Sequence, residues 1–180
     1  EMDGFEFCGQ IKSNIEISHV PVILLTAKTD TESKIKGLEA GADAYIEKPF
    51  SPFHLKAQLR NLLKKRENQQ KEYASTPLSD LHSAVHNKLD EEFMNKCTEI
   101  ILSNIEDTEF SVNTLAQDLG MSRTSVFTKI KGIIGMTPND FIKITRLKKA
   151  CQMMMEGEYR VTEIGYLVGF SSSSYFAKCF

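Results

Sequence analysis

SVNTLAQDLGMSRTSVFTKIKGIIG, residues 111–135, has the pattern of two short helices joined by a tight turn. Apolar residues at helical spacing give the first helix one buried face, at Leu115, Ala116 and Leu119. Gly120 suits the turn, because glycine adopts a left-handed conformation without the steric cost of a Cβ. Ser122 can cap a second helix, in which Val126 and Ile130 are spaced i, i+4. This pattern predicts a helix-turn-helix, which places its second helix in the DNA major groove, and a helical hairpin in a bundle is the alternative.

The segment VTEIGYLVGFSSSSYFAKCF, residues 161–180, repeats this pattern. Five residues of the first motif recur 49 positions later: Val112, Leu115, Ala116, Leu119 and Gly120 correspond to Val161, Ile164, Gly165, Val168 and Gly169. Beyond the glycine the offset becomes 50, so that Ser122, Val126, Thr128 and Ile130 correspond to Ser172, Phe176, Lys178 and Phe180. A predicted long helix, begun by Thr137 and Pro138 and ended by Gly157, joins the motifs, and Cys151 is among its expected inward residues. Such a duplication is hard to explain as a plain bundle.

The composition is that of an ordinary globular chain. Of 180 residues, 41% are apolar, and the formal net charge is -2, so that any phosphate-binding surface must be local. Four widely spread cysteines without a CxxC pair are typical of reduced thiols in the cytosol. No apolar run reaches membrane-spanning length. His82 and His86 are spaced i, i+4, but no convincing third ligand accompanies them, so we interpret them as surface residues and predict no metal site.

The first third of the chain alternates helices with short strands. PVILLT, residues 21–26, is a continuous apolar run typical of a strand buried on both faces, and residues 44–47 form a second short strand. Helices are predicted before the first strand, over residues 30–40 and from Ser51 onward. The predicted fold class is therefore an α/β half with parallel strands, over residues 1–66, followed by an all-α domain over residues 90–180. Residues 67–89 are predicted to be a linker, helical at its start. The all-α domain then begins with a predicted helix that ends near Asp107 and has one apolar face, formed by Phe93, Cys97, Ile100 and Ile101.

The outward residues of the second helix of each motif are the expected contacts with base edges. They are Arg123, Thr124, Phe127 and Thr128 in the first motif and Ser173, Ser174, Ala177 and Lys178 in the second. Backbone N–H groups near Ser122 and Ser172 are expected to hold phosphates. Lys129 and Lys131 are expected to reach the DNA backbone as well, although Lys129 stands where such motifs often have an apolar residue, with its stem across the core edge.

Two helix-turn-helix motifs joined by a long helix resemble the DNA-binding domain of the AraC family, and residues 91–180 cover nearly all of it. TEIGYLVGFSSSSYFAKCF is similar to the signature of that family's second motif, which usually continues into a basic stretch and a Gly-x-x-Pro turn. The first third resembles the second half of a response-regulator receiver domain, which has a flavodoxin-like fold. The segments that carry this resemblance are Met2-Asp3-Gly4, Leu25-Thr26-Ala27 and Tyr45-Ile46-Glu47-Lys48-Pro49.

The receiver resemblance implies roles for three residues. Thr26 would donate its hydroxyl to a phosphoryl group, Lys48 would neutralise that group, and Tyr45 would turn inward on activation, with a cis bond between Lys48 and Pro49. The family's phosphoacceptor Asp and the acidic pair that holds Mg²⁺ have no counterpart in this sequence. We therefore expect no phosphorylation of this segment and no cofactor. An uncovered strand edge predicts that the half-domain is partly disordered or completed by another chain. The two ends of the sequence suggest a fragment.

A receiver followed by an AraC-type domain resembles the end of a two-component response regulator, and most closely the hybrid regulators of Bacteroides-type bacteria. In those proteins a periplasmic sensor, a kinase, a receiver and an AraC domain share one chain. The resemblance implies a cytoplasmic, non-enzymatic transcriptional regulator. Its partners would be double-stranded DNA, a second copy bound through the receiver helices over 30–41 and 51–66, and an upstream histidine kinase, which the same parent chain can include. The alternative is a module that docks another protein without reading DNA.

Overall fold

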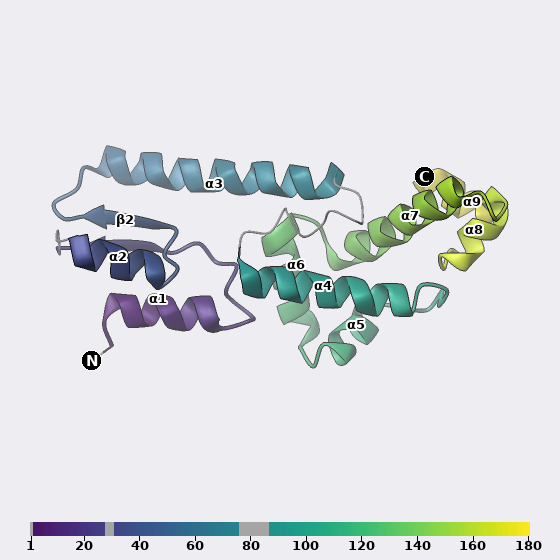
Figure 1. The fold of residues 1–180 in the computed structure, drawn as a ribbon, viewed down its shortest axis with the longest axis horizontal. Coiled ribbons are helices and arrows are strands. Elements are labelled where there is room, and N and C mark those ends of the chain that lie inside the picture. The colour runs from purple at the N-terminus through teal and green to yellow at the C-terminus, as the bar shows by residue number, and fades with distance from the viewer. Residues whose placement is uncertain (1, 28–30, 76–86) are drawn as a thin grey trace.

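The computed structural model describes residues 2–27, 31–75 and 87–180, which form three units in a row (Figure 1). The N-terminal part, residues 2–66, contains the strands. The first helical unit follows, and the second helical unit lies at the far end. The elements are α1 (Gly4–Ser13), β1 (Ile23–Thr26), α2 (Thr31–Glu39), β2 (Ala44–Glu47), α3 (Pro52–Ser75), α4 (Lys88–Ser103), α5 (Val112–Asp118), α6 (Arg123–Ile134), α7 (Pro138–Glu156), α8 (Val161–Leu167) and α9 (Ser173–Cys179). The predicted fold class, an α/β half followed by an all-α domain, is confirmed.

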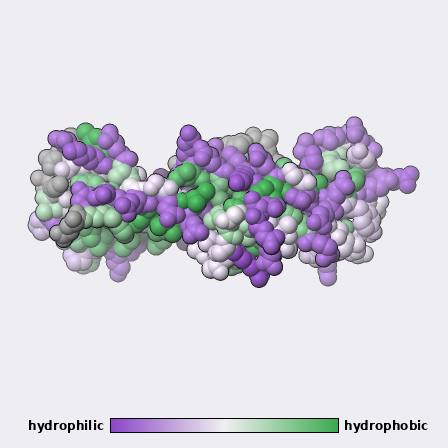
Figure 2. All heavy atoms as spheres, turned by 90° about the horizontal axis from the view of Figure 1, so that it is seen from below, coloured by the Kyte–Doolittle hydropathy of each residue, from purple (hydrophilic) through white to green (hydrophobic). Residues whose placement is uncertain are grey.

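The two strands of the N-terminal part pair in parallel, in a register that runs from Ile23 opposite Ala44 to Thr26 opposite Glu47. Helix α1 packs against β1 and α2 against β2, while α3 lies on the other side of β2 in Figure 1. Several large apolar side chains stay exposed, among them Leu38 at 63% and Phe53 at 85%. Figure 2 shows the resulting hydrophobic surface along this part of the molecule. The predicted disorder of this part, or its completion by another chain, stays a prediction.

Helix α3 connects the N-terminal part to the first helical unit. Its 24 residues give it a length of roughly 36 Å at 1.5 Å per residue. The helix therefore runs nine residues beyond Arg66, from position 67 to Ser75, into the predicted linker. Its distal half packs against α6, as Figure 1 shows. His82 and His86 lie outside the described residues.

Helix α4 differs from its predicted bounds at both ends. It begins at Lys88, where the Asn87 side chain accepts a hydrogen bond from the Leu89 N–H. It ends at Ser103 rather than near Asp107. Residues between α4 and α5 instead form turns closed by local backbone hydrogen bonds. The helix still buries the predicted apolar stripe, which includes Phe93, Cys97 and Ile101.

Two separate cores hold the two helical units. The first core collects side chains from α4, α5, α6 and the start of α7, and the second collects side chains from the end of α7, α8 and α9. Helix α7 therefore belongs to both units and fixes their separation. Its N-terminus is capped by the Thr137 hydroxyl, which accepts from the Asp140 N–H, and Gly157 ends it at φ 74°. The predicted inward position of Cys151 is wrong, because α7 turns Ala150 into the core and leaves Cys151 exposed.

The turns of the two motifs repeat the same hydrogen bonds. Met121 N–H donates to the Ala116 carbonyl at 2.9 Å, and the equivalent Phe170 N–H donates to the Gly165 carbonyl at 3.0 Å. Gly120 and Gly169 both have positive φ, at 65° and 81°, as the sequence predicted for the first of them.

The two motifs fill the crossing between their helices with different pairs of side chains, a larger residue on one helix being matched by a smaller one on the other. Ala116 and Val126 are buried in the first unit, where Gly165 and Phe176 take their places in the second. A Cβ on Gly165 would lie 3.0 Å from Phe176 Cδ1. The larger ring of Phe176 therefore needs the smaller residue opposite it, and both motifs keep a close helix crossing.

Candidate nucleic-acid interface

The N-terminal half of α6 presents the predicted reading residues to solvent. Ser122 precedes the helix, and its hydroxyl accepts from the Ser125 N–H at 3.0 Å. This cap leaves the first backbone N–H groups of α6 pointing outward, at the positive end of the helix dipole. The four predicted base contacts of this helix are all exposed: Arg123, Thr124, Phe127 and Thr128.

Lys131 extends this surface by one turn. Its side chain is exposed, and its ammonium lies 5.6 Å from the centroid of the Phe127 ring. Phe127 is itself 41% exposed, so the ring supports the lysine without covering it. This position suits a phosphate contact next to the major groove.

Helix α9 offers a less charged surface. The Ser172 hydroxyl caps it by accepting from the Tyr175 N–H at 3.2 Å. The predicted residues Ser174, Ala177 and Lys178 are exposed, and Ser173 is half-buried. Tyr175 stands beside them with 53% of its surface exposed, although it is not among the contacts predicted from the sequence. At the offset of 50 positions, Tyr175 is equivalent to Ser125 of the first motif, and Ser125 is not among the predicted contacts either.

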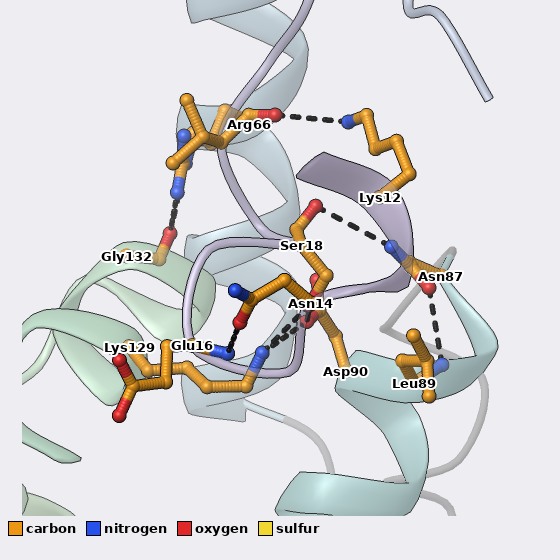
Figure 3. Close-up of polar contacts among 11 residues, drawn as sticks. Lys12, Asn14, Glu16, Ser18, Arg66, Asn87, Leu89, Asp90, Lys129 and Gly132 are labelled. Carbon is orange, nitrogen blue, oxygen red and sulfur yellow. Dashed lines mark hydrogen bonds and ion pairs between the residues drawn. The ribbon is translucent and has the colours of Figure 1, made fainter. Parts of the chain in front are cut away.

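Lys129 does not belong to this surface, which corrects the prediction that it reaches the DNA backbone. Its side chain is 0% exposed, and its ammonium donates to Asp90 Oδ1 at 2.6 Å and to Ser18 Oγ at 2.8 Å. The ammonium also lies 5.0 Å from the centroid of the Phe93 ring. Figure 3 shows Lys129 reaching from α6 toward Asp90 and Ser18. The physical reason is that a buried ammonium needs a carboxylate partner, and Asp90 of α4 supplies it inside the protein.

The C-terminal half of α6 is covered by the N-terminal part and α3. The Arg66 guanidinium donates to the Gly132 carbonyl, with Nε at 2.8 Å (Figure 3). The Gln70 amide approaches the same oxygen at 3.5 Å. His19 lies against Gly132 from the loop that follows α1. Burial and then the nearby charge of Lys129 lower the pKa of His19 to about 4, so the ring is neutral at pH 7.

A polar cleft of about 570 Å³ remains beside these contacts, between the N-terminal part and α4. Its lining includes four cationic side chains, Lys12, Lys65, Arg66 and Lys88, and two carboxylates, Asp43 and Asp90. Lys12 is paired with Asp43 at 2.7 Å, and Arg66 is held by Gly132. The cleft therefore lies at the interface between the N-terminal part and the first helical unit. Much of the charge on its lining residues is already neutralised by ion pairs and hydrogen bonds within the protein.

Arg146 of α7 joins the two helical units. It is 9% exposed, and its guanidinium donates to the Gly169 carbonyl at 2.9 Å and to the Asp107 carbonyl. One side chain thus ties the segment after α4 to the turn between α8 and α9. Gly169 allows this approach, since a Cβ there would lie 2.8 Å from Arg146 Cζ. Nothing in the apolar spacing of α7 indicated this residue.

The residues implied by the receiver resemblance lie near the carboxyl ends of the parallel strands. Thr26 ends β1, Tyr45 lies within β2, and Lys48 follows β2, where its N–H donates to the Thr26 carbonyl at 2.6 Å. The Lys48–Pro49 bond is cis, as the resemblance implied. Tyr45 packs against Gly37 of α2.

Among the residues that the structure describes, the side chains do not fit the Mg²⁺ ion that a complete receiver would hold. In the described ranges no group of three His, Cys, Asp or Glu side chains could bind a metal. Likewise, within residues 2–27, 31–75 and 87–180, no helix is both long and apolar enough to cross a bilayer.

Comparison with known families finds two matches along the chain. Residues 1–60 match the response regulator receiver domain, and residues 115–180 match a helix-turn-helix domain. The whole chain is 38% identical to "Histidine kinase P4" of Formosa agariphila, of which it spans 13%. It is 33% identical over 155 residues to "Transcriptional regulatory protein SpaR" of Bacillus subtilis, covering 82% of this chain and 66% of that protein.

Two solved structures are similar to the helical part. The C-terminal domain of AraT, a response regulator from Geobacillus stearothermophilus, matches with a TM-score of 0.44 and 21% identity, over 48% of this chain and 71% of that chain. The C-terminal domain of the response regulator yesN from Fusobacterium nucleatum matches with a TM-score of 0.43 and 24% identity, over 48% of this chain and 92% of that one. The two family models and the histidine kinase relative, without these structural matches, assign residues 1–60 to the response regulator receiver family and residues 115–180 to the AraC-type helix-turn-helix domains. This pairing supports a DNA-binding transcriptional regulator of two-component signalling.

Proposed function

We propose that residues 87–180 bind double-stranded DNA sequence-specifically, as the output end of a two-component phosphorelay. The observation that carries the proposal is the pair of capped helices, α6 and α9, that expose polar residues at their N-terminal halves on one framework. Recognition helices of this kind contact base edges with their first residues. Arg123 can pair with guanine, Thr128 can bond a base edge, and Phe127 can pack on a thymine methyl.

The two motifs divide this work unequally. Helix α6 offers an arginine and a lysine beside its polar residues, while the exposed face of α9 consists mainly of Ser174, Tyr175, Ala177 and Lys178. We therefore expect α6 to supply most of the sequence discrimination and α9 most of the placement. Two recognition helices on one face of DNA would lie in successive major grooves about 34 Å apart. We expect α7, which belongs to both helical units, and Arg146, which joins them, to set the spacing between α6 and α9.

The N-terminal part would bring two such DNA-binding units together. Exposed apolar side chains on α2 and α3, including Ile35, Leu38 and Leu59, support a homodimer through the helices over 30–41 and 51–66. Pairing two DNA-binding units raises affinity through effective concentration, without new contacts. Because the sequence contains no counterpart of the phosphoacceptor Asp to accompany Thr26 and Lys48, we do not expect this segment alone to be phosphorylated. An upstream histidine kinase, acting in the cytoplasm, would supply the signal.

A salt series of DNA binding tests the proposal. The 180-residue chain is mixed with 40-bp duplexes that it has enriched from a random pool, and affinity is measured from 50 to 300 mM KCl. Specific binding should exceed binding to scrambled duplexes, and log K should fall linearly with log salt as counterions return to the phosphates. Failure to enrich any sequence would contradict the proposal. A salt-insensitive complex with another protein, and none with DNA, would favour the protein-docking alternative.

A further inference from the structure

We propose that Lys129 is a positioning residue, through which the N-terminal part fixes the recognition helix α6 and thereby tunes DNA binding. The inference rests on the proposed function for its consequence in DNA binding. The structural part of the inference is that contacts from residues 14–20 and from α3 hold α6 in place. This part rests only on hydrogen bonds and close approaches between these elements.

The contact is a closed triangle of hydrogen bonds from three elements. Lys129 of α6 donates to Asp90 of α4 and to Ser18 of the loop after α1, and the Ser18 hydroxyl donates to Asp90 Oδ1 at 2.6 Å. Ser18 is 1% exposed and Asp90 5% exposed, so the triangle is largely buried, with Ser18 and Asp90 at the edge of the cleft. Polar networks buried in this way are rigid when every member is satisfied. Asp90 and Lys129 belong to the first helical unit, and Ser18 is the N-terminal part's contribution.

Gly132 provides an independent indication of the same contact. Glycine inside a helix costs about 1 kcal/mol relative to alanine, so a close approach is the expected reason for it. A Cβ on Gly132 would lie 2.5 Å from His19 Nε2 and 3.2 Å from Arg66 Nη2. The Gly132 carbonyl meanwhile accepts from Arg66. The N-terminal part therefore reaches the backbone of α6 directly, one turn beyond Lys129.

These contacts lie on one half of α6 and leave the other half free. Ser18, His19, Arg66 and Gln70 meet the helix between Lys129 and Gly135, whereas the reading residues precede Lys129 or point away from it. Docking of the N-terminal part is thus compatible with DNA binding. A movement of the loop after α1, or of α3, is transmitted to α6 because the helix is held from both sides.

The test uses the 180-residue chain and two mild substitutions with matched controls. Ser18→Ala removes the N-terminal part's partner of Lys129 while the Asp90 pair remains, and its control is Ser13→Ala on the exposed side of α1. Gly132→Ala pushes His19 away from α6, and its control is Gly9→Ala, where a Cβ meets nothing within 4 Å. Amide hydrogen exchange of residues 123–134 reports on α6, and fluorescence anisotropy with the enriched 40-bp duplexes reports on DNA affinity.

Both substitutions should speed exchange in α6 and weaken DNA binding by about 5-fold to 10-fold, since less of the population holds α6 in its binding position. The slope of log K against log salt should stay unchanged, because no phosphate contact is lost. Lys131→Ala, in contrast, should reduce that slope by about 0.9. Exchange and affinity equal to those of the controls, tighter binding, or a reduced slope for Ser18→Ala would overturn the inference.

A double variant distinguishes a positioning role from a general loss of structure. His19→Ala combined with Gly132→Ala removes the ring that the new Cβ meets, so the double variant should recover slower exchange in α6 than Gly132→Ala alone. No recovery would overturn the assigned contact. If the wild-type chain enriches no duplex, the proposed function fails, but the exchange measurements still decide whether the N-terminal part holds α6.

Discussion

Lys129 Nζ lies 2.6 Å from Asp90 Oδ1, with the lysine side chain fully buried on the recognition helix and the aspartate buried on α4. Because of this ion pair, Lys129 stabilises the packing of α6 against α4 instead of contacting DNA, as its sequence position had suggested. Its partners come from elements far apart in the sequence: α4, α6 and the loop after α1. The consequences can be measured in stability, in DNA binding and in the response to pH.

Breaking the buried pair on one side should be more harmful than removing it. Lys129→Met leaves Asp90 charged and unpaired, and should lower the free energy of unfolding by about 3–5 kcal/mol. Lys129→Met combined with Asp90→Asn removes both charges and should recover most of that loss. Urea unfolding followed by circular dichroism measures both variants. A loss below about 1 kcal/mol for the single variant would mean that the pair is open to water.

Arg146→Met should loosen the two helical units from each other. The substitution leaves the carbonyls of Asp107 and Gly169 without their charged donor, which should cost about 2–3 kcal/mol of stability. DNA selected by the variant should also tolerate a wider range of spacings between half-sites, since α7 no longer fixes the second unit. Arg60→Met, an exposed position on α3, is the control. Unchanged spacing preference in Arg146→Met would show that α7 sets the distance without this arginine.

The exchange of volume between Gly165 and Phe176 should appear as energetic coupling. Gly165→Ala places a Cβ 3.0 Å from the Phe176 ring and should destabilise the chain by about 1–3 kcal/mol. Phe176→Val should cost about 2–4 kcal/mol through the cavity it leaves. The double variant recreates the Ala116 and Val126 pairing of the first motif, so its loss should be smaller than the sum of the two. Thermal unfolding provides the double-mutant cycle, and strict additivity would argue against a shared crossing.

The first recognition helix should dominate sequence discrimination. Arg123→Ala and Thr128→Ala together should weaken binding to enriched duplexes more than Ser173→Ala and Ser174→Ala together, because a guanine contact is worth about 1–3 kcal/mol. Binding to scrambled duplexes should change much less in either case. Competition anisotropy at fixed salt measures both ratios. If the serine pair proves costlier, α9 is the main reader.

Stability should fall as the pH is lowered from about 6.5 toward 4, because of His19. Burial and the positive charges of Lys129, Arg66 and Lys12 outweigh the opposing effect of Asp90 and hold the folded pKa at about 4. The unfolded chain, with the ordinary value of 6.5, then takes up a proton that the folded chain excludes. Above pH 6.5 the contribution is fully present. His19→Gln should flatten this part of the urea stability curve, and an unchanged slope between pH 6.5 and 5 would contradict the assignment.

Local sequence signals determined most of the fold. Serine and threonine caps at Ser122, Thr137 and Ser172 act within one helical turn, and each accepts the hydrogen bond that its position predicted. The repeat at an offset of 49 residues showed that one crossing geometry occurs twice, because turn glycines and apolar pairs obey the same short-range constraints. The exposed reading residues could also be selected from the sequence, since they lie opposite an apolar face of known period.

The sequence on its own could not establish which charged residues are buried between the units, or which partners they have there. Lys129 is an unusual residue on an apolar face, yet the burial of its charge depends on Asp90, 39 positions earlier, and on Ser18, 111 positions earlier. Arg146 likewise binds backbone carbonyls, which any residue supplies, so no sequence pattern marks its partners. Helical period assigns a residue to a face, whereas only the packing of distant elements decides whether that face meets DNA, solvent or another part of the chain.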